Sequence, residues 1–221
     1  MGGTVRLYHF VGEKYGLDNV LRRRLKIARI DDLNDPFEFM ARAAGERERA
    51  ALRATKMEQS KKTGLLCFSR GWRNPLQWSH YAERHRGVCL GFDIDDSQIK
   101  QVNYRKSPLR FELQRYLADD SYAQAFSERL VSTKFEDWRY EDEFRLYVKL
   151  DPATETNGLY FYEFSDQLRL TELIVGAGST ITREQANAAL GNLAGHVISK
   201  KARMAFRTYG IVEQRNPKFW S

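Results

Sequence analysis

Two carboxylates placed two residues apart are the feature of this sequence best suited to chemistry. Glu141 and Glu143 lie in the segment WRYEDEFRLYV. If both belong to one strand, their side chains project from the same face, with Arg145 beyond them. Neighbouring carboxylates disfavour each other's ionisation unless a cation or a substrate hydroxyl lies between them. The pair therefore suits a site that binds sugar hydroxyls and stabilises an oxocarbenium-like centre. The alternative is a solvated strand edge with a Glu143–Arg145 ion pair.

A second concentration of functional side chains lies in residues 67–92, CFSRGWRNPLQWSHYAERHRGVCLGF. On a helix, Trp78, Tyr81 and His85 would fall near one stripe, and His80 would lie about 100° from Tyr81. These aromatic faces and the neighbouring arginines could grip a base or a nicotinamide ring. Core packing is the alternative role for Trp78 and Tyr81.

Two loops offer further candidate contacts. In LNDPFEF, residues 33–39, Asn34 and Asp35 favour a turn, so the segment is either a structural corner or a loop that points Asp35 or Glu38 into a cleft. The glycines of VGAGST, residues 175–180, match no complete phosphate-binding motif, so a simple helix-entry turn is favoured there. The candidate contacts to substrate or phosphate are Arg70, Trp78, His80, His85, Asn34 and Asp35.

The two cysteines and two of the histidines lack the spacing of a metal site. Cys67, Cys89, His80 and His85 form neither a CxxC nor an HExxH pattern, and we expect no metal. Both cysteines lie in apolar runs. We expect buried free thiols and a reducing compartment, with a disulfide as the alternative.

Alternation and turn residues predict the elements that must position these side chains. Strands are expected over 4–11, the first half of 25–39, 64–69, 87–94, 102–104, 142–150, 158–164, 170–176, 196–199 and 208–213. Helices are expected over 17–24 with Asp18 as its cap, over 43–62, 75–85 with Asn74 as its cap, and 181–193, with one or two in 108–131 that break at 118–121. Because the strands gather in the second half without regular βαβ alternation, we predict one α+β domain over 1–221, with a mixed, mainly antiparallel sheet and flanking helices.

Composition limits the class of protein and the kind of partner. The 221 residues are 42% hydrophobic and 29% charged, which excludes wholesale disorder. A net charge of +7 favours a polyanionic partner such as RNA, DNA, a nucleotide or anionic lipid. The N-terminus does not resemble a secretory signal, and no apolar run approaches the roughly 20 residues of a membrane span. We therefore expect a cytoplasmic protein with no membrane partner.

Several segments together resemble a bacterial family, domain-of-unknown-function family 2971. They are LYHF, LNDPFEF, CFS followed by QWSHYAERHRGVCLGFDI, and K(x)3WRYEDEFRL, and they span nearly the whole chain. Leu33 and Gln77 stand where that family usually has Phe and Met. The resemblance implies no settled reaction.

The opening of the chain, LYHF followed by DNVLRRRLKI, is similar to that of DarT-like ADP-ribosyltransferases. Val11 stands where those proteins carry Thr. In transferases of that fold, three strands supply an early His or Arg, a middle Ser or Tyr and a late Glu. His9, Ser69 and Glu143 occur here in that order, so the resemblance implies an ADP-ribosyltransferase-like fold with NAD as substrate.

The resemblance also implies a role for each residue. His9 would hold the adenosine ribose, while Ser69 and Tyr81 would hold the nicotinamide ribose, with Arg145 also in the NAD-binding set. Glu143 would bind a ribose hydroxyl and stabilise the oxocarbenium ion. Glu141 would orient the acceptor.

The leading hypothesis is therefore an enzyme that transfers ADP-ribose from NAD to a nucleic acid or protein, as a toxin or phage-defence effector with an antitoxin or defence-system partner. It requires His9, Ser69 and Glu143 to converge on one cleft. The alternative is a non-catalytic nucleic-acid-binding module or a nuclease-like defence effector, and it is motivated by the basic charge, Trp72, Trp78 and the arginines at 22–24. A structural partner protein with no cleft near Glu143 is the third interpretation.

Overall fold

The main sheet is centred on β1 (Thr4–Val11) and β6 (Val88–Asp95), which pair along their whole lengths. The computed structural model describes residues 3–220. Within that range, nine strands form the main sheet. Their path is β15 (Ile211–Glu213), β14 (Ile198–Met204), β13 (Leu168–Val175), β6, β1, β5 (Thr63–Ser69), β11 (Glu143–Lys149) and β7 (Ile99–Gln101), and β3 (Ala28–Arg29) also pairs with β5. In this sheet β13 and β14 pair in parallel and the other pairs are antiparallel.

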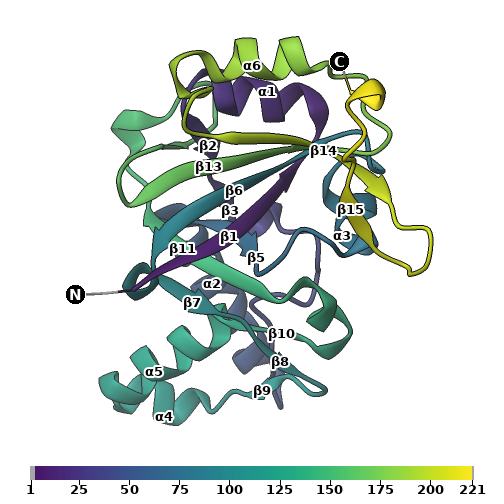
Figure 1. Cartoon of the computed structure of the whole chain (residues 1–221). Helices are drawn as coiled ribbons and strands as arrows, with labels where there is room; N and C mark the ends of the chain where they lie inside the picture. The colour runs from purple at the N-terminus through teal and green to yellow at the C-terminus, as the bar shows by residue number, and fades with distance from the viewer. Residues whose placement is uncertain (1–2, 221) are drawn as a thin grey trace.

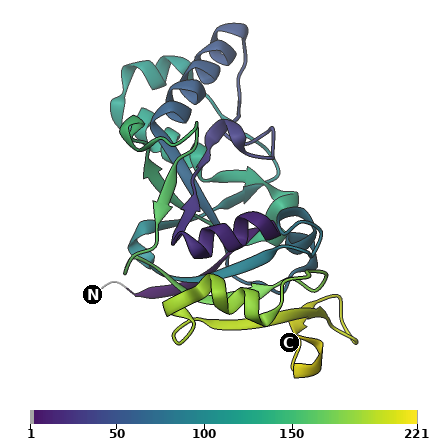
Figure 2. The same ribbon diagram turned by 90° about the horizontal axis from the view of Figure 1, so that it is seen from above.

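Helices cover the two ends of this sheet differently. Helices α1 (Glu13–Leu21) and α6 (Arg183–Leu190) lie together beside the β13–β14 end, whereas α4 (Leu113–Ala118) and α5 (Asp120–Val131) lie at the opposite end (Figures 1 and 2). The remaining α-helices are α2 (Glu46–Lys62) and α3 (Pro75–Tyr81). The predicted fold class is confirmed: the chain forms one α+β domain around a mixed, mostly antiparallel sheet.

Short strand pairs and 3-10 turns complete the described chain. The pairs are β2 (Arg24–Lys26) with β12 (Phe161–Glu163), β4 (Ala41–Arg42) with β9 (Leu109–Arg110), and β8 (Asn103–Arg105) with β10 (Thr133–Phe135). The 3-10 turns are η1 (Ile30–Asp32), η2 (Asp96–Gln98), η3 (Glu136–Glu141), η4 (Pro152–Thr154), η5 (Gly191–Leu193) and η6 (Pro217–Phe219).

Alternation along the strands divides the buried side chains between the two faces of the sheet. On β11, Phe144 and Leu146 join the largest apolar cluster, as their spacing predicts. Arg145 and Tyr147 point to the other face, which residues 30–39 and the end of α5 cover. Because both faces of β11 are covered, its charged side chains Glu143 and Arg145 are shielded from water.

The sheet opens between β1 and β5. β1 forms eight register pairs with β6 but only one with β5, between Tyr8 and Ser69. β5 remains paired with β11 over seven residues. Beyond Tyr8, β1 and β5 therefore diverge. Backbone groups that would have paired between these two strands are then free to bond with side chains.

Several predicted element boundaries are wrong. The helix expected over 17–24 begins at Glu13 and ends at Leu21, so Asp18 lies inside it and pairs with Arg22. The helix expected over 181–193 spans Arg183–Leu190, capped by Thr182 through a capping box with Gln185. The strand expected over 196–199 runs to Met204.

Helix α3 confirms its predicted start but not its predicted end. The side chain of Asn74 accepts a hydrogen bond from the Leu76 N–H, and Pro75 occupies the first turn. The helix stops at Tyr81 instead of His85, because residues 83–85 have φ between 49° and 68°, which breaks the helical path.

The break predicted at 118–121 is confirmed. Asp119 ends α4 and its side chain accepts a hydrogen bond from Tyr122 N–H at the start of α5. Among the described residues, no helix has both the length and the apolar character needed to cross a membrane.

Candidate functional site

A cleft of about 300 Å³ occupies the opening between β1 and β5. Its walls come from four parts of the chain: the end of β1, the loop at 32–38, the end of β5 with α3, and the segment from β10 to β11. The lining residues are Tyr8, His9, Phe10, Asp32, Leu33, Asn34, Glu38, Cys67, Phe68, Ser69, Tyr81, Lys134, Glu141 and Glu143.

Strand register places three of the predicted residues at this cleft. Ser69 stands opposite Glu143 on β11 and opposite Tyr8 on β1, the residue before His9. His9, Ser69 and Glu143 therefore come from three adjacent strands, and all three line the same cavity. Their convergence depends on the sheet order, because 134 residues of sequence numbering separate His9 from Glu143.

The His9 side chain lies in the gap where β1 and β5 diverge and bonds to the backbone of β5. Its Nδ1 lies 2.9 Å from the carbonyl oxygen of Cys67, a group that β1 would pair with if the strands remained together. A carbonyl oxygen only accepts, so Nδ1 carries the proton and Nε2 carries a lone pair. Burial lowers the pKa of His9, which keeps the ring neutral. The cleft thus contains an uncharged imidazole with one acceptor nitrogen.

Glu141 does not belong to the strand, so the expected same-face arrangement of the two carboxylates is wrong. It ends η3, and Asp142 follows with φ 41° in the left-handed region before β11 begins at Glu143. This turn nevertheless sends both carboxylates to one point, because both contact the same ammonium group. Glu141 and Glu143 are each only 4% exposed, which also excludes a solvated strand edge.

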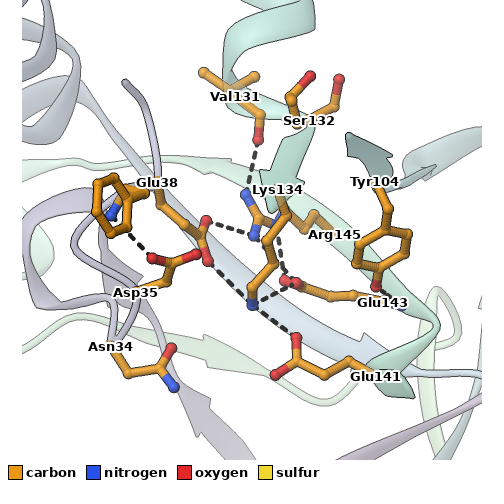
Figure 3. A network of polar contacts seen from close by, with 12 residues as sticks. Asn34, Asp35, Glu38, Tyr104, Val131, Ser132, Lys134, Glu141, Glu143 and Arg145 are labelled. Atoms are coloured by element: carbon orange, nitrogen blue, oxygen red, sulfur yellow. Dashed lines mark hydrogen bonds and ion pairs between the residues drawn. The ribbon is translucent and has the colours of Figure 1, made fainter. Parts of the chain in front are cut away.

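That ammonium group belongs to Lys134 on β10 and binds three carboxylates (Figure 3). Lys134 Nζ lies 2.6 Å from Glu141, 3.1 Å from Glu143 and 3.1 Å from Glu38. The fully buried Arg145 lies behind them, with Nε 2.7 Å from Glu143 and Nη2 2.5 Å from Glu38. We call these five residues the ion cluster.

The ion cluster holds three carboxyl groups against two cations. Burial raises the pKa of Glu143, but Arg145 and Lys134 outweigh this effect and lower that pKa to about 2. Burial likewise raises the pKa of Glu141, and for this group the contact with Lys134 does not fully compensate. Glu143 is thus held as a carboxylate, and Glu141 is the member that takes up a proton more readily.

Tyr81 and Gln77, both on α3, fix the other side of the cleft. The Tyr81 hydroxyl donates to Glu141 and accepts from Asn34 Nδ2 at 2.8 Å. Burial, followed by the charge of Glu141, raises the pKa of Tyr81, so the phenol stays protonated as a donor. Gln77 Nε2 donates to the Ser69 hydroxyl and to the Glu141 carbonyl, and thereby orients Ser69.

Several residues expected to contact substrate or phosphate do not line this cleft. Trp78 is fully buried and donates its ring N–H to the Trp72 carbonyl, so it packs in the core. His85 stacks on Trp78 and lines a different cavity, and Asp35 accepts from Phe37 N–H within its own turn. Arg145 lies behind Glu143 in the ion cluster and is not a lining residue.

Two others are exposed beside the cleft. The Arg70 guanidinium lies 4.4 Å from the centre of the Phe144 ring and 3.8 Å from the Asp142 carboxylate. His80 lies among Tyr81, Trp138 and Tyr140. Of the predicted phosphate and substrate contacts, Asn34 alone is among the lining residues.

The sequence reasoning did not assign a site role to Lys134, Gln77 or Tyr104. Tyr104 supports the site from β8, where its hydroxyl accepts from the Glu143 N–H at 2.9 Å. Lys134 is the first residue of the K(x)3WRYEDEFRL pattern, so the signal was present. Its role was hidden because no local periodicity relates a lysine on β10 to a glutamate in the loop at 32–38.

Both cysteines are free. Cys89 is buried and Cys67 is partly buried at the cleft. Burial raises the pKa of each thiol, so neither is a ready nucleophile. Across residues 3–220, no three His, Cys, Asp or Glu side chains form a group that could hold a metal ion.

Comparison with known proteins gives one family match. Residues 77–146 match the family model described as protein of unknown function (DUF2971). The matched region runs from α3 into β11 and contains Tyr81, Lys134, Glu141 and Glu143. No curated protein and no solved structure matches the chain.

Proposed function

We propose that this cleft binds NAD and that the protein transfers ADP-ribose from NAD to an acceptor. The observation that carries the proposal is the convergence of His9, Ser69 and Glu143, from three adjacent strands, on one cavity. That arrangement is the one expected from the resemblance to DarT-like transferases. The cavity volume suits the nicotinamide ribose half of the dinucleotide, with the adenosine half lying along β1.

The charge of the ion cluster supports this substrate. Breaking the glycosidic bond of NAD places positive charge on the ribose carbon. The cluster sets three carboxyl groups against two cations, and its contacts with Arg145 and Lys134 hold Glu143 as a carboxylate. An excess negative charge fixed in a water-poor site stabilises such a cation more strongly than water does. The same charge favours the positively charged nicotinamide ring of the bound substrate.

The side chains also offer suitable partners for ribose hydroxyls. Glu143 accepts hydrogen bonds because its pKa is low, and His9 presents an acceptor at Nε2 because its ring is neutral. The Ser69 hydroxyl can donate, since it already accepts from Gln77. Arg70 follows Ser69 in sequence but lies over the Phe144 ring and beside Asp142, so it is not assigned a contact with the diphosphate.

The proposed reaction needs one bond to break and one to form. The bond between the ribose C1′ and the nicotinamide nitrogen breaks, and its electron pair leaves with nicotinamide. Glu143 stabilises the resulting oxocarbenium ion. The acceptor nucleophile then bonds to C1′ and gives its proton to Glu141, whose raised pKa suits a general base.

Glu143→Gln tests this proposal. We expect wild-type protein mixed with NAD to release nicotinamide, and Glu143→Gln to lower that rate at least 100-fold because it removes the charge facing C1′. Glu58→Gln on the exposed face of α2 is the matched control and keeps the wild-type rate. Circular dichroism checks that the variant is folded. Equal turnover in wild type and Glu143→Gln would exclude the assignment.

The acceptor and the biological role belong to the same proposal. A transferase that modifies nucleic acid would act as a toxin or a phage-defence effector and would need an antitoxin or defence-system partner. The wild type and Glu143→Gln are each expressed in a bacterial host, and growth of the host is measured. Growth arrest by the wild type alone supports the role, whereas arrest by both versions contradicts it.

A further inference from the structure

The β14–β15 hairpin carries large aromatic side chains that do not pack into a hydrophobic core. Its strands pair from Ala202 to Met204 with Ile211 to Glu213, and Ala205 N–H donates to the Gly210 carbonyl at the neck of the loop. At the tip, Phe206 is 91% exposed and Tyr209 is fully exposed. The hairpin projects from the edge of the sheet in both views (Figures 1 and 2). Large rings held in water on a defined hairpin are typical of a binding surface.

The same part of the chain is strongly basic. Residues 196–221 contain six Lys or Arg residues and one Glu, which amounts to five of the seven net positive charges. The Arg203 guanidinium lies 4.5 Å from the centre of the Phe206 ring, and Arg207 is exposed between Phe206 and Tyr209. Rings interleaved with arginines provide faces for stacking and cations for phosphates.

Behind the tip lies a hollow of about 550 Å³. Its walls are Pro75, His85 and residues 204–211. His85 Nε2 lies 3.0 Å from the Ser79 hydroxyl, whereas its buried Nδ1 has no hydrogen-bond partner among the described residues. The hollow lies directly beside the exposed rings of Phe206 and Tyr209, both of which line it. A flat group such as a base could therefore enter it while a neighbouring base stacks on a ring.

The hairpin is fixed to the loop and helix that also form the cleft. Ile211 N–H donates to the Arg73 carbonyl at 2.9 Å, in the loop between Ser69 and α3. Pro75 at the start of α3 lines the hollow, and Tyr81 at its end lines the cleft. Six residues of helix span about 9 Å, so a strand bound at the hairpin lies close to the cleft.

We infer that the β14–β15 hairpin binds single-stranded nucleic acid, with bases stacked on Phe206 and Tyr209 and one base seated against His85. Charge complementarity and stacking favour this partner. An anionic lipid surface would match the charge as well, so vesicles form the competing arm of the test. That the bound strand is the acceptor rests on the proposed function, whereas the binding itself does not.

Fluorescence anisotropy with labelled single strands of about 15 nucleotides tests the inference, because stacking sites span roughly 4–16 nucleotides. RNA, DNA and duplexes of the same sequence are compared with the full chain. We expect both single strands to bind more tightly than duplex. Phe206→Ala combined with Tyr209→Ala should weaken binding about 10- to 100-fold, whereas the control Phe219→Ala, another exposed ring, should change it less than about twofold.

Salt dependence provides a second, independent measurement. Arg207→Ala should reduce the slope of log affinity against log salt by about 0.7, since one phosphate contact is lost. Arg47→Ala, at an exposed position on α2, should leave the slope unchanged. Equal effects of the hairpin substitutions and their controls would overturn the inference. Ring-dependent binding to vesicles containing phosphatidylserine, with no binding of either nucleic acid, would overturn it as well.

The two proposals fail in different ways. If the wild type releases no nicotinamide but the hairpin substitutions weaken nucleic-acid binding, the transferase is excluded and the hairpin surface stands. If nicotinamide is released and the Phe206→Ala and Tyr209→Ala substitutions leave the nucleic-acid affinity unchanged, the hairpin surface is excluded and the transferase stands.

Discussion

The two glutamates of the YEDEFR segment differ in their protonation because their surroundings differ. Glu143 contacts both Arg145 and Lys134, which hold its pKa far below the ordinary value. Glu141 contacts Lys134 and a tyrosine hydroxyl, and its burial dominates. Two carboxylates pushed in opposite directions are the usual basis for separate electrostatic and acid–base roles in one site.

This difference predicts a change in acid stability. A carboxylate whose folded pKa is about 2 instead of 4.5 stabilises the fold above pH 4.5, and that contribution is lost as pH falls toward 2. At about 1.36 kcal/mol per pKa unit, it amounts to up to about 3 kcal/mol. We expect the unfolding free energies of wild type and Glu143→Gln to converge by up to that amount between pH 5 and pH 2, as measured by urea denaturation.

Glu141→Gln is the matched control for this measurement. The folded pKa of Glu141 is raised, so its ionisation opposes folding at high pH and this cost fades as pH falls. The acid-induced loss of stability should therefore persist in Glu141→Gln. If both variants retain the wild-type acid profile, Glu143 is not the group that Arg145 and Lys134 hold ionised.

At the scale of elements, the turn between η3 and β11 determines where Glu141 points. Continuous strand geometry would have placed Glu141 and Glu143 on one face, two residues apart. Instead Asp142 adopts a left-handed conformation. Glu141, which lies just before the start of β11, thereby places its carboxylate against Lys134 (Figure 3). The position of Glu141 thus depends on one backbone conformation that few residue types adopt easily.

Asp142→Val should therefore damage both stability and activity. A β-branched residue at φ 41° costs roughly 1–2 kcal/mol or displaces the turn. We expect the unfolding free energy to fall by about that amount and nicotinamide release to fall at least tenfold. Asp142→Gly and Asp142→Asn tolerate this conformation and should remain close to wild type in both measurements. Wild-type turnover in Asp142→Val would show that the turn does not position Glu141.

At the scale of the whole molecule, the ion cluster joins parts of the chain that are far apart in sequence. Glu38 comes from the loop after η1, Lys134 from the strand after α5, and Arg145 from the main sheet. Arg145 also donates to the Val131 carbonyl at the end of α5. The cluster therefore fastens the region of α4 and α5 to the sheet and at the same time forms the floor of the cleft.

Lys134→Met should test this fastening. It would leave three buried carboxyl groups with Arg145 as the remaining cation of the cluster, and removing one partner from a buried ion group costs about 3–5 kcal/mol. The control is Lys100→Met, which breaks the exposed pair with Glu128 and should cost less than about 1 kcal/mol. Urea denaturation compares the two. Equal small losses would mean that the cluster contributes little to holding these parts together.

The fold class, most strands and the capped start of α3 were predictable from residue patterns alone. Alternation of apolar residues reports which side of a strand is buried, and Asn74 followed by Pro75 is a local signal for a helix start. The predicted boundaries of helices were wrong where local sequence signals were absent or misleading. The left-handed residues at 83–85 ended α3 early, and nothing nearby marked the start of α1 at Glu13.

Which candidate residues meet depends on how the elements pack in three dimensions. Trp78 and His85 have the residue types of a binding site, yet α3 turns Trp78 into the core, and the left-handed turn after α3 places His85 in the hollow beside the hairpin. The position of Lys134 depends on β10 and its pairing with β8, which no local periodicity in the sequence predicts. Residue types and spacing along one element fix local geometry, whereas the order of β1, β5 and β11 in the sheet fixes contacts between elements. The cleft between β1 and β5 exists because that order, and not the sequence spacing, brings His9, Ser69 and Glu143 together.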